Sequence, residues 1–204
     1  MKTVYVLGGA SNARWLHPFY EEITAVEYGH QLPTANTPLC DLLLFTGGQD
    51  LRPVMYNKNY PFITGSTIRD EWESAWYFWA VKNKVPMFGI CRGMQLFTAM
   101  TGGTLIPDVD GHYGSHAVTT IGAELNQFQV NSIHHQMCVP NKGAKLLAWA
   151  ENIAFKGKGR VEPEALWFPH VRALGVQWHP EMMPTNSAAT EFVYSQIKEH
   201  IIGG

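Results

Sequence analysis

The sequence has little charge, and its positive charge is not concentrated anywhere. Among 204 residues there are 15 Lys and Arg and 17 Asp and Glu, so the formal net charge is −2. The densest basic stretch is Lys156-Gly-Lys-Gly-Arg160, which is typical of a solvated turn. A protein that binds nucleic acid needs a basic face to contact the phosphates. We therefore expect no nucleic-acid partner.

Long hydrophobic runs are also missing. No apolar segment approaches the roughly 20 residues that a membrane-spanning helix needs. The first residues, Met1-Lys-Thr-Val-Tyr-Val-Leu7, lead directly into a strand pattern and lack the core and cleavage site of a signal peptide. We therefore expect a cytoplasmic protein that has no membrane partner.

Cysteine is scarce and unpaired in its spacing. Three well-separated cysteines, Cys40, Cys91 and Cys138, fit a reducing compartment better than a disulfide framework. The sequence has nine histidines but neither a CxxC pair nor an HExxH helix, the common zinc signatures. We therefore predict no metal site and no cofactor.

The first half of the chain alternates apolar strands with helices. Continuous apolar runs, typical of strands in a sheet covered on both faces, occur at Thr3–Leu7, Leu42–Phe45 and Val85–Ile90. The residues from Arg69 to Lys82 place Trp72, Trp76, Trp79 and Ala80 on one side of a predicted helix. The residues from His17 to Ile23 are weakly helical. This alternation predicts a doubly wound α/β fold with a mostly parallel sheet and helices on both faces.

In the second half of the chain, apolar residues recur at the shorter spacing that is typical of strands. We predict further strands, several of them antiparallel at one edge of the sheet, at His116–Ile121, Gln127–Asn131, Lys145–Ala150, Val161–Trp167 and Leu174–Trp178. An amphipathic helix over Asn186–Ile202 closes the fold. The chain has no repeat and no linker, so residues 1–204 are predicted to form a single domain.

One cysteine lies where a strand is expected to meet a helix. The strand pattern ends at Ile90, and helical spacing begins directly after Cys91. Gly89 and Gly93 leave room for the close backbone approach of a sharp turn. The N-terminal amides of the following helix favour thiolate over thiol at Cys91. Taken alone, however, Cys91 fits an ordinary buried thiol better, because that is the commoner role of a cysteine in apolar surroundings.

The partners that a nucleophilic cysteine needs are found at other strand ends. His179 can act as the base, and Glu181 can orient it, because positions two apart in extended backbone project to the same side. The backbone amides of Arg92 and Gly48 can form an oxyanion hole. Gly47-Gly48 fits a simple tight turn as well.

Two motifs carry a resemblance to a known superfamily. Gly89-Ile-Cys-Arg-Gly-Met-Gln95 and Gly175-Val-Gln-Trp-His-Pro-Glu181 resemble the class I glutamine amidotransferases, which use a Cys-His-Glu triad. Further segments are similar to the γ-glutamyl hydrolase branch, which includes the γ-glutamyl-GABA hydrolases and is classed as peptidase family C26: Phe45–Tyr56, Arg69–Glu73, Gly102–Leu105 and Val130–Gln136.

The resemblance implies a flavodoxin-like fold and a cysteine hydrolase. Such an enzyme cleaves the γ-glutamyl amide bond of glutamine or a γ-glutamyl amine through a thioester and releases glutamate. The implied roles are nucleophile for Cys91, general base and acid for His179, orienting carboxylate for Glu181, and backbone oxyanion donors for Gly48 and Arg92.

The resemblance also implies a set of residues that bind the glutamyl group. These are Gly47, Gln95, Ser132, His134 and His135. Purely structural roles remain open for these residues. Gln95 fits a polar residue on a helix face, and either histidine fits a core histidine whose ring nitrogens are hydrogen-bonded within the protein. Arg69 and Glu73, at i,i+4 spacing, fit a simple surface ion pair.

Two other functions fit the same sequence. The chain can be a glutaminase subunit that supplies ammonia to a separate synthase, or a binding protein that keeps the fold without catalysis. The segments Phe45–Tyr56 and Arg69–Glu73 favour the free-standing hydrolase, and an intact triad argues against the binding protein.

Overall fold

The computed structural model describes residues 2–26, 31–60, 65–122, 126–151 and 161–203. The basic stretch from Lys156 to Arg160 lies outside the described residues, so its prediction as a solvated turn is untested.

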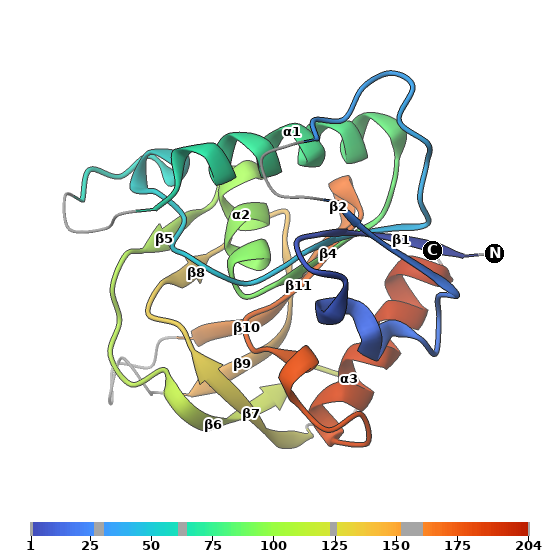
Figure 1. The fold of residues 1–204 in the computed structure, drawn as a ribbon. Helices are drawn as coiled ribbons and strands as arrows, with labels where there is room; N and C mark the ends of the chain where they lie inside the picture. The colour runs from blue at the N-terminus through green and yellow to red at the C-terminus, as the bar shows by residue number, and fades with distance from the viewer. Residues whose placement is uncertain (1, 27–30, 61–64, 123–125, 152–160, 204) are drawn as a thin grey trace.

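Within the described residues, the strands form one large sheet and a small ribbon (Figure 1). The large sheet has nine strands in the order β2-β1-β3-β4-β11-β10-β9-β6-β7. Five of them are parallel: β2 (Glu22–Val26), β1 (Thr3–Leu7), β3 (Leu42–Phe45), β4 (Met87–Ile90) and β11 (Ala173–Val176). The other four are antiparallel: β10 (Val161–Phe168), β9 (Lys145–Glu151), β6 (Tyr113–Thr120) and β7 (Gln127–Ile133). The ribbon pairs β5 (Thr104–Ile106) with β8 (Met137–Val139).

Helices cover both faces of the parallel strands (Figure 1). Helices α1 (Thr67–Asn83) and α2 (Arg92–Met100) bury their apolar sides in one core, and α3 (Ala188–Ile197) and the 3-10 helix η1 (Ala10–Leu16) pack in the other. Alternate residues of β3 enter the two cores, which explains its continuous apolar run. The predicted doubly wound fold with an antiparallel edge is confirmed.

Some local predictions differ from the structure. The stretch from His17 to Ile23 is not helical, because strand β2 begins at Glu22 and pairs along its length with β1. Its β-branched residues fit this pairing better than a helix. Strands β5 and β8 are three residues long and give no periodic signal. The last helix is capped by Ser187, which accepts from the Thr190 N–H, and its final residues Lys198–Ile202 form a π-helical turn.

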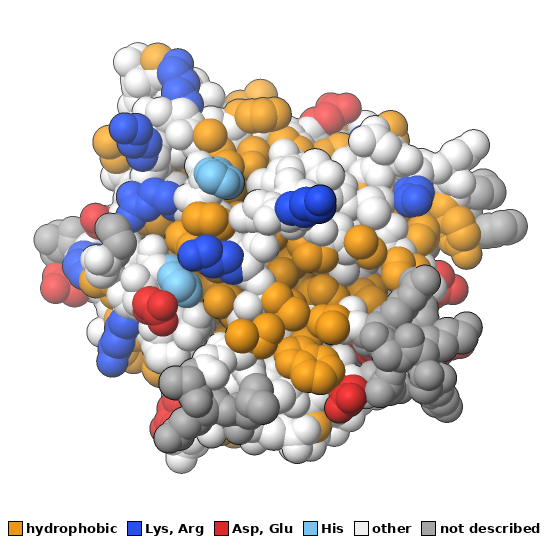
Figure 2. All heavy atoms as spheres, turned by 180° about the vertical axis from the view of Figure 1, so that it is seen from behind, with side chains coloured by type: hydrophobic (Ala, Val, Ile, Leu, Met, Phe, Trp, Pro, Cys, Tyr) orange, Lys and Arg blue, Asp and Glu red, His pale blue; other side chains and the backbone are white. Residues whose placement is uncertain are grey.

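No helix among the described residues combines the length and apolar character required to cross a bilayer. Seen from behind, the surface carries a broad patch of apolar side chains, with most of the visible Lys and Arg side chains to one side of it (Figure 2).

Candidate active site

Cys91 occupies a strained turn between β4 and α2. Its backbone has φ 50° and ψ −100°, an uncommon conformation for a residue other than glycine. The residues two before and two after the cysteine must be glycine, because other backbone atoms pack closely against both of them. A Cβ on Gly89 would lie 2.6 Å from the carbonyl carbon of Gly93, and one on Gly93 would lie 2.7 Å from the Phe45 carbonyl oxygen. The sulfur therefore sits at the N-terminus of α2, as the sequence predicts.

His179 and Glu181 lie beyond the end of the neighbouring strand β11. Nδ1 of His179 donates to Oε1 of Glu181 over 2.7 Å, and Cys91 lies near enough to the His179 ring to raise its pKa. Because Glu181 occupies Nδ1, Nε2 is the ring nitrogen left for the sulfur. Glu181 lies in a 3-10 turn, Pro180–Met182, so the expected extended backbone is wrong although the expected pairing is present.

The pKa of His179 reflects these two neighbours. Burial by itself would lower it, but the hydrogen bonds and negative charges of Cys91 and Glu181 outweigh burial and raise the pKa to about 10. The imidazole of His179 therefore keeps its proton at neutral pH and lies as a cation beside the Cys91 sulfur.

The raised pKa makes a prediction about stability. A histidine whose pKa is higher in the folded than in the unfolded protein stabilises the fold fully below about pH 6.5, its unfolded pKa, and loses this contribution as the pH rises towards 10. We expect the free energy of unfolding of wild type to exceed that of His179→Gln by an amount that shrinks over this range, measured by urea denaturation at several pH values. The exposed-site control His170→Gln should differ from wild type by no more than about 0.5 kcal/mol. A difference that grows with pH would contradict the assignment.

The Gly47-Gly48 turn follows β3 and lies against the histidine. A Cβ on Gly47 would lie 2.5 Å from Cε1 of His179, so the imidazole packs directly on this backbone. Gly48 has φ +143°, and the Arg69 guanidinium fills the place where its Cβ would be. Neither glycine can be replaced without movement of a charged side chain.

Gly47 therefore offers a test of how His179 is positioned. We expect Gly47→Ala to push the imidazole away from Cys91 and to lower kcat/KM by about 100-fold, the cost of a displacement near 1 Å in an active site. Gly9→Ala is the matched control, because the nearest side-chain atom to its added Cβ would be Ser11 Oγ at 3.6 Å. Equal activity of the two variants would show that the packing of Gly47 on His179 has no role.

A network of buried ion pairs holds the Gly47-Gly48 turn in place. Arg92 pairs with Asp70 over 2.5 Å and with Glu73, while Nε of Arg69 donates to Glu73 over 2.8 Å. Nη2 of Arg69 also donates to the carbonyl of Gly47 over 2.9 Å. The expected surface pair is thus wrong in its location, because the Glu73 side chain is 0% exposed. The network joins α1 and the start of α2 to the glycine turn.

Two glutamine side chains link the cysteine to neighbouring segments by hydrogen bonds. Nε2 of Gln177 donates to Sγ of Cys91 over 3.4 Å. Nε2 of the buried Gln95 lies 3.5 Å from Oε1 of Gln177 and 3.3 Å from the carbonyl of Gln136. Gln95 is therefore a buried polar residue of α2 that is linked to Cys91 through Gln177.

Three predicted substrate residues lie in different surroundings, Ser132 on β7 and His134 and His135 between β7 and β8. Ser132 Oγ donates to the His112 carbonyl over 2.7 Å. The ring of His134 is buried, whereas His135 is partly exposed, with Nε2 2.9 Å from Asp50. Their contact with a glutamyl group stays a prediction.

Asn131 is a further residue of the site that the sequence reasoning missed. Its side chain accepts from the backbone N–H of His179 over 2.9 Å and donates to the His179 carbonyl over 3.0 Å. These two bonds fix the backbone that carries the imidazole. The signal was present, because Asn131 and Gln177 both lie inside the motifs quoted for the resemblance.

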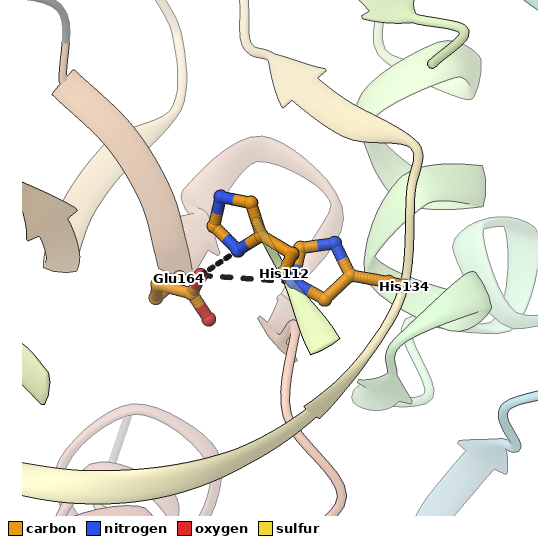
Figure 3. A group of neighbouring side chains, drawn as sticks. All are labelled: His112, His134 and Glu164. Carbon is orange, nitrogen blue, oxygen red and sulfur yellow. Dashed lines mark ion pairs between the residues drawn. The ribbon is translucent and has the colours of Figure 1, made fainter. Parts of the chain in front are cut away.

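One cluster near this site can hold a metal ion. Among the described residues, His112, His134 and Glu164 each offer a ligand atom, and these atoms all lie within 4.8 Å of one another (Figure 3).

The comparison with protein families decides the affiliation of the chain. The model of the peptidase C26 family matches residues 29–181. The chain belongs to the peptidase C26 family. The match includes Cys91, His179 and Glu181, and it confirms the resemblance that the motifs carry.

Three curated proteins that this C26 chain resembles are 25% to 32% identical to it over the aligned residues. It is 32% identical over 164 residues to the putative glutamine amidotransferase-like protein YvdE of Lactococcus lactis, covering 70% of this chain and 66% of that protein. It is 29% identical to protein NtpR of Enterococcus hirae, covering 76% and 72%. It is 25% identical to the gamma-glutamyl-gamma-aminobutyrate hydrolase PuuD of Escherichia coli, covering 71% and 65%. The matched region thus spans about two thirds to three quarters of these relatives.

Solved structures share the fold of this C26 chain at low identity. A putative GMP synthase subunit from Thermoplasma acidophilum superposes with a TM-score of 0.72 at 14% identity, covering 100% of this chain and 95% of that one. A glutamine amidotransferase from Thermotoga maritima gives a TM-score of 0.65 at 16% identity, covering 97% and 84%. At such identities the likeness concerns the fold alone.

Proposed function

We propose that the protein is a cysteine hydrolase that cleaves the γ-glutamyl amide bond of a γ-glutamyl amine or of glutamine, with residues 1–204 acting as a single catalytic domain. The observation that carries the proposal is the chain of contacts from Cys91 through His179 to Glu181, with the cysteine in a strained turn at a helix N-terminus. Membership of the C26 family supports it, as does the similarity to PuuD.

The first half of the proposed reaction forms a thioester. Sγ of the Cys91 thiolate attacks the γ-carbonyl carbon, and the oxyanion accepts from the backbone amides of Gly48 and Arg92. Arg92 belongs to the first turn of α2, where amides take no part in intrahelical hydrogen bonds. Nε2 of His179 then gives its proton to the departing amine, and the C–N bond breaks.

The second half releases glutamate. Once the sulfur is acylated, its negative charge no longer holds the proton on His179, so the imidazole becomes a better base. It takes a proton from water, which attacks the thioester carbonyl, and the C–S bond breaks to restore the thiolate and the imidazolium. Glu181 keeps the ring in the same tautomer throughout.

A second candidate is a glutaminase subunit that passes ammonia to a separate synthase. The motifs Gly89–Gln95 and Gly175–Glu181, which resemble the class I glutamine amidotransferases, fit this function as well. The segments from Phe45 to Tyr56 and from Arg69 to Glu73 favour the free-standing hydrolase, because they resemble the γ-glutamyl hydrolase branch.

The two candidates differ in what they turn over alone. We expect the purified protein to release glutamate from a γ-glutamyl amine, such as γ-glutamyl-GABA, faster than from glutamine and without any added protein. Cys91→Ala serves as the blank for contaminating activity. Hydrolysis of glutamine that appears only when a synthase is added would reject the hydrolase in favour of the glutaminase.

A further inference from the structure

A group of buried ionisable side chains near the candidate active site performs no chemical step of the proposed reaction, although one of them, His134, is among the residues predicted to bind the glutamyl group. His112 precedes β6, His116 lies on β6, His134 follows β7, and Glu162 and Glu164 lie on β10. All five are buried, at most 9% exposed. Their side chains converge, as Figure 3 shows for three of them.

The hydrogen bonds of two histidines define which ring nitrogen carries the proton. Nε2 of His112 lies 3.0 Å from a carboxylate oxygen of Glu162, which only accepts, so this nitrogen is the donor. Nδ1 of His134 donates in the same way to the carbonyl of Gln136 over 3.1 Å. In a neutral imidazole the other nitrogen then carries a lone pair. Those two nitrogens, Nδ1 of His112 and Nε2 of His134, both face Glu164.

When both rings are neutral, these two nitrogens and Oε1 of Glu164 are three lone-pair atoms that face one another. Nδ1 of His112 lies 3.5 Å, and Nε2 of His134 3.7 Å, from Oε1 of Glu164. Charge-assisted hydrogen bonds are shorter, at about 2.7–2.9 Å. Both nitrogens and Oε2 of Glu164 are buried without a hydrogen-bond partner. Such a set is costly to bury unless a proton or a metal cation lies between its members.

Two of the three ligand separations are close to those in the ligand shell of a small transition-metal ion, and the third is within 4.8 Å. Zinc binds imidazole nitrogen and carboxylate oxygen at about 2.0–2.1 Å, which places two tetrahedral ligands roughly 3.3 Å apart. The separations of 3.5 and 3.7 Å need only a slight contraction to reach that value. Two imidazoles and one carboxylate suit zinc and its neighbours better than magnesium or calcium, which prefer oxygen ligands alone.

We propose that His112 Nδ1, His134 Nε2 and the Glu164 carboxylate bind one divalent transition-metal ion, with zinc as the best fit. Metal-binding histidines usually donate their second N–H to a carboxylate or a carbonyl, as these do to Glu162 and Gln136. His116 orients the carboxylate, because its Nε2 lies 3.0 Å from Oε1 of Glu164.

A metal at this site would stabilise the strand segment next to the nucleophile. The backbone carbonyl of Glu164 accepts from the N–H of Gln177 over 2.7 Å, and the Gln177 side chain donates to Sγ of Cys91. A metal that joins β10 to the residues flanking β6 and β7 therefore holds the strand segment that contacts the sulfur. This role is structural and adds no step to the reaction.

Metal binding can be measured directly on the full chain, without substrate. The protein is stripped with a chelator and titrated with Co²⁺, whose visible absorption reports tetrahedral coordination by nitrogen and oxygen, and then with Zn²⁺ in competition. We expect one equivalent of Co²⁺ to bind, Zn²⁺ to displace it, and Mg²⁺ to have no effect. The melting temperature should rise on addition of Zn²⁺.

Variants separate this site from adventitious binding. Glu164→Gln should abolish the cobalt spectrum, and Glu162→Gln, which changes only a partner of His112, should weaken Zn²⁺ binding by about 10- to 100-fold. The double variant His17→Gln, His170→Gln removes two exposed histidines and should bind as wild type.

Three results would overturn the proposal. They are wild-type protein that binds neither Co²⁺ nor Zn²⁺, a Glu162→Gln variant that is folded by circular dichroism and binds as wild type, and loss of binding in the exposed-histidine variant. Because Glu162→Gln replaces no ligand, it keeps the test decisive even when Glu164→Gln does not fold. Since activity is not the readout, each result is independent of the proposed function.

Discussion

Replacing Cys91 with alanine should lower kcat/KM for γ-glutamyl amides by at least about 10⁴-fold. Members of a catalytic triad act as a unit, so removal of the nucleophile removes nearly everything that the triad contributes. The loss should be catalytic and not structural, because alanine keeps the Cβ and leaves the strained backbone of the turn in place. The measurement is glutamate release by folded protein, with folding checked by circular dichroism.

Cys40→Ala is the matched control for this prediction. Cys40 is also buried but precedes β3, at the end of that strand opposite to the glycine turn. It should retain turnover close to wild type. A Cys91→Ala variant with more than about a tenth of wild-type activity would show that another group performs the attack.

Glu73→Gln should lower the free energy of unfolding by about 3–5 kcal/mol, the usual cost of removing one partner of a buried ion pair. Glu73 accepts from both Arg69 and Arg92, and its side chain is 0% exposed. The remaining carboxylate, Asp70, already pairs with Arg52 over 2.6 Å. The variant therefore leaves the buried guanidinium charge with less compensation than it has in wild type.

Glu71→Gln on the same helix is the control, because Glu71 is exposed. Its free energy of unfolding should stay within about 0.5 kcal/mol of wild type in urea denaturation at neutral pH. A loss in Glu73→Gln that is no greater than in the control would mean that the network does not stabilise the fold. Because the network supports Gly47, activity should fall in Glu73→Gln even where the protein is fully folded.

The elements around Cys91 were predictable because local patterns specify them. An apolar run before the cysteine, small residues on both sides of it and helical spacing after it describe β4, the turn and α2 without knowledge of the rest of the fold. The approach of His179 followed from the general rule that carboxyl ends of parallel strands share one edge.

Features that depend on distant contacts were not predictable. The spacing of Arg69 and Glu73 is the same for an exposed pair and for a buried one, and only the packing of α1 against α2 makes it buried. Strand β2 forms because it pairs with β1, although its sequence next to His17 is weakly helical.

The histidine cluster was missed for a related reason. Its members His112, His134 and Glu164 come from three separate segments, so no spacing within one helix or strand marks them. Sequence patterns identify metal sites most readily when several ligands lie close together along the chain.

The most direct test of the account is to label the protein with a glutamine-mimicking diazoketone, such as 6-diazo-5-oxonorleucine, and to map the adduct by mass spectrometry. The reagent forms an adduct only where a reactive sulfur lies in a pocket that accepts a glutamyl group, so it tests both properties at once. We predict one adduct, on Cys91, with none on Cys40 or Cys138, and loss of labelling in Cys91→Ala. Absence of any adduct, or equal labelling of all three cysteines, would contradict it.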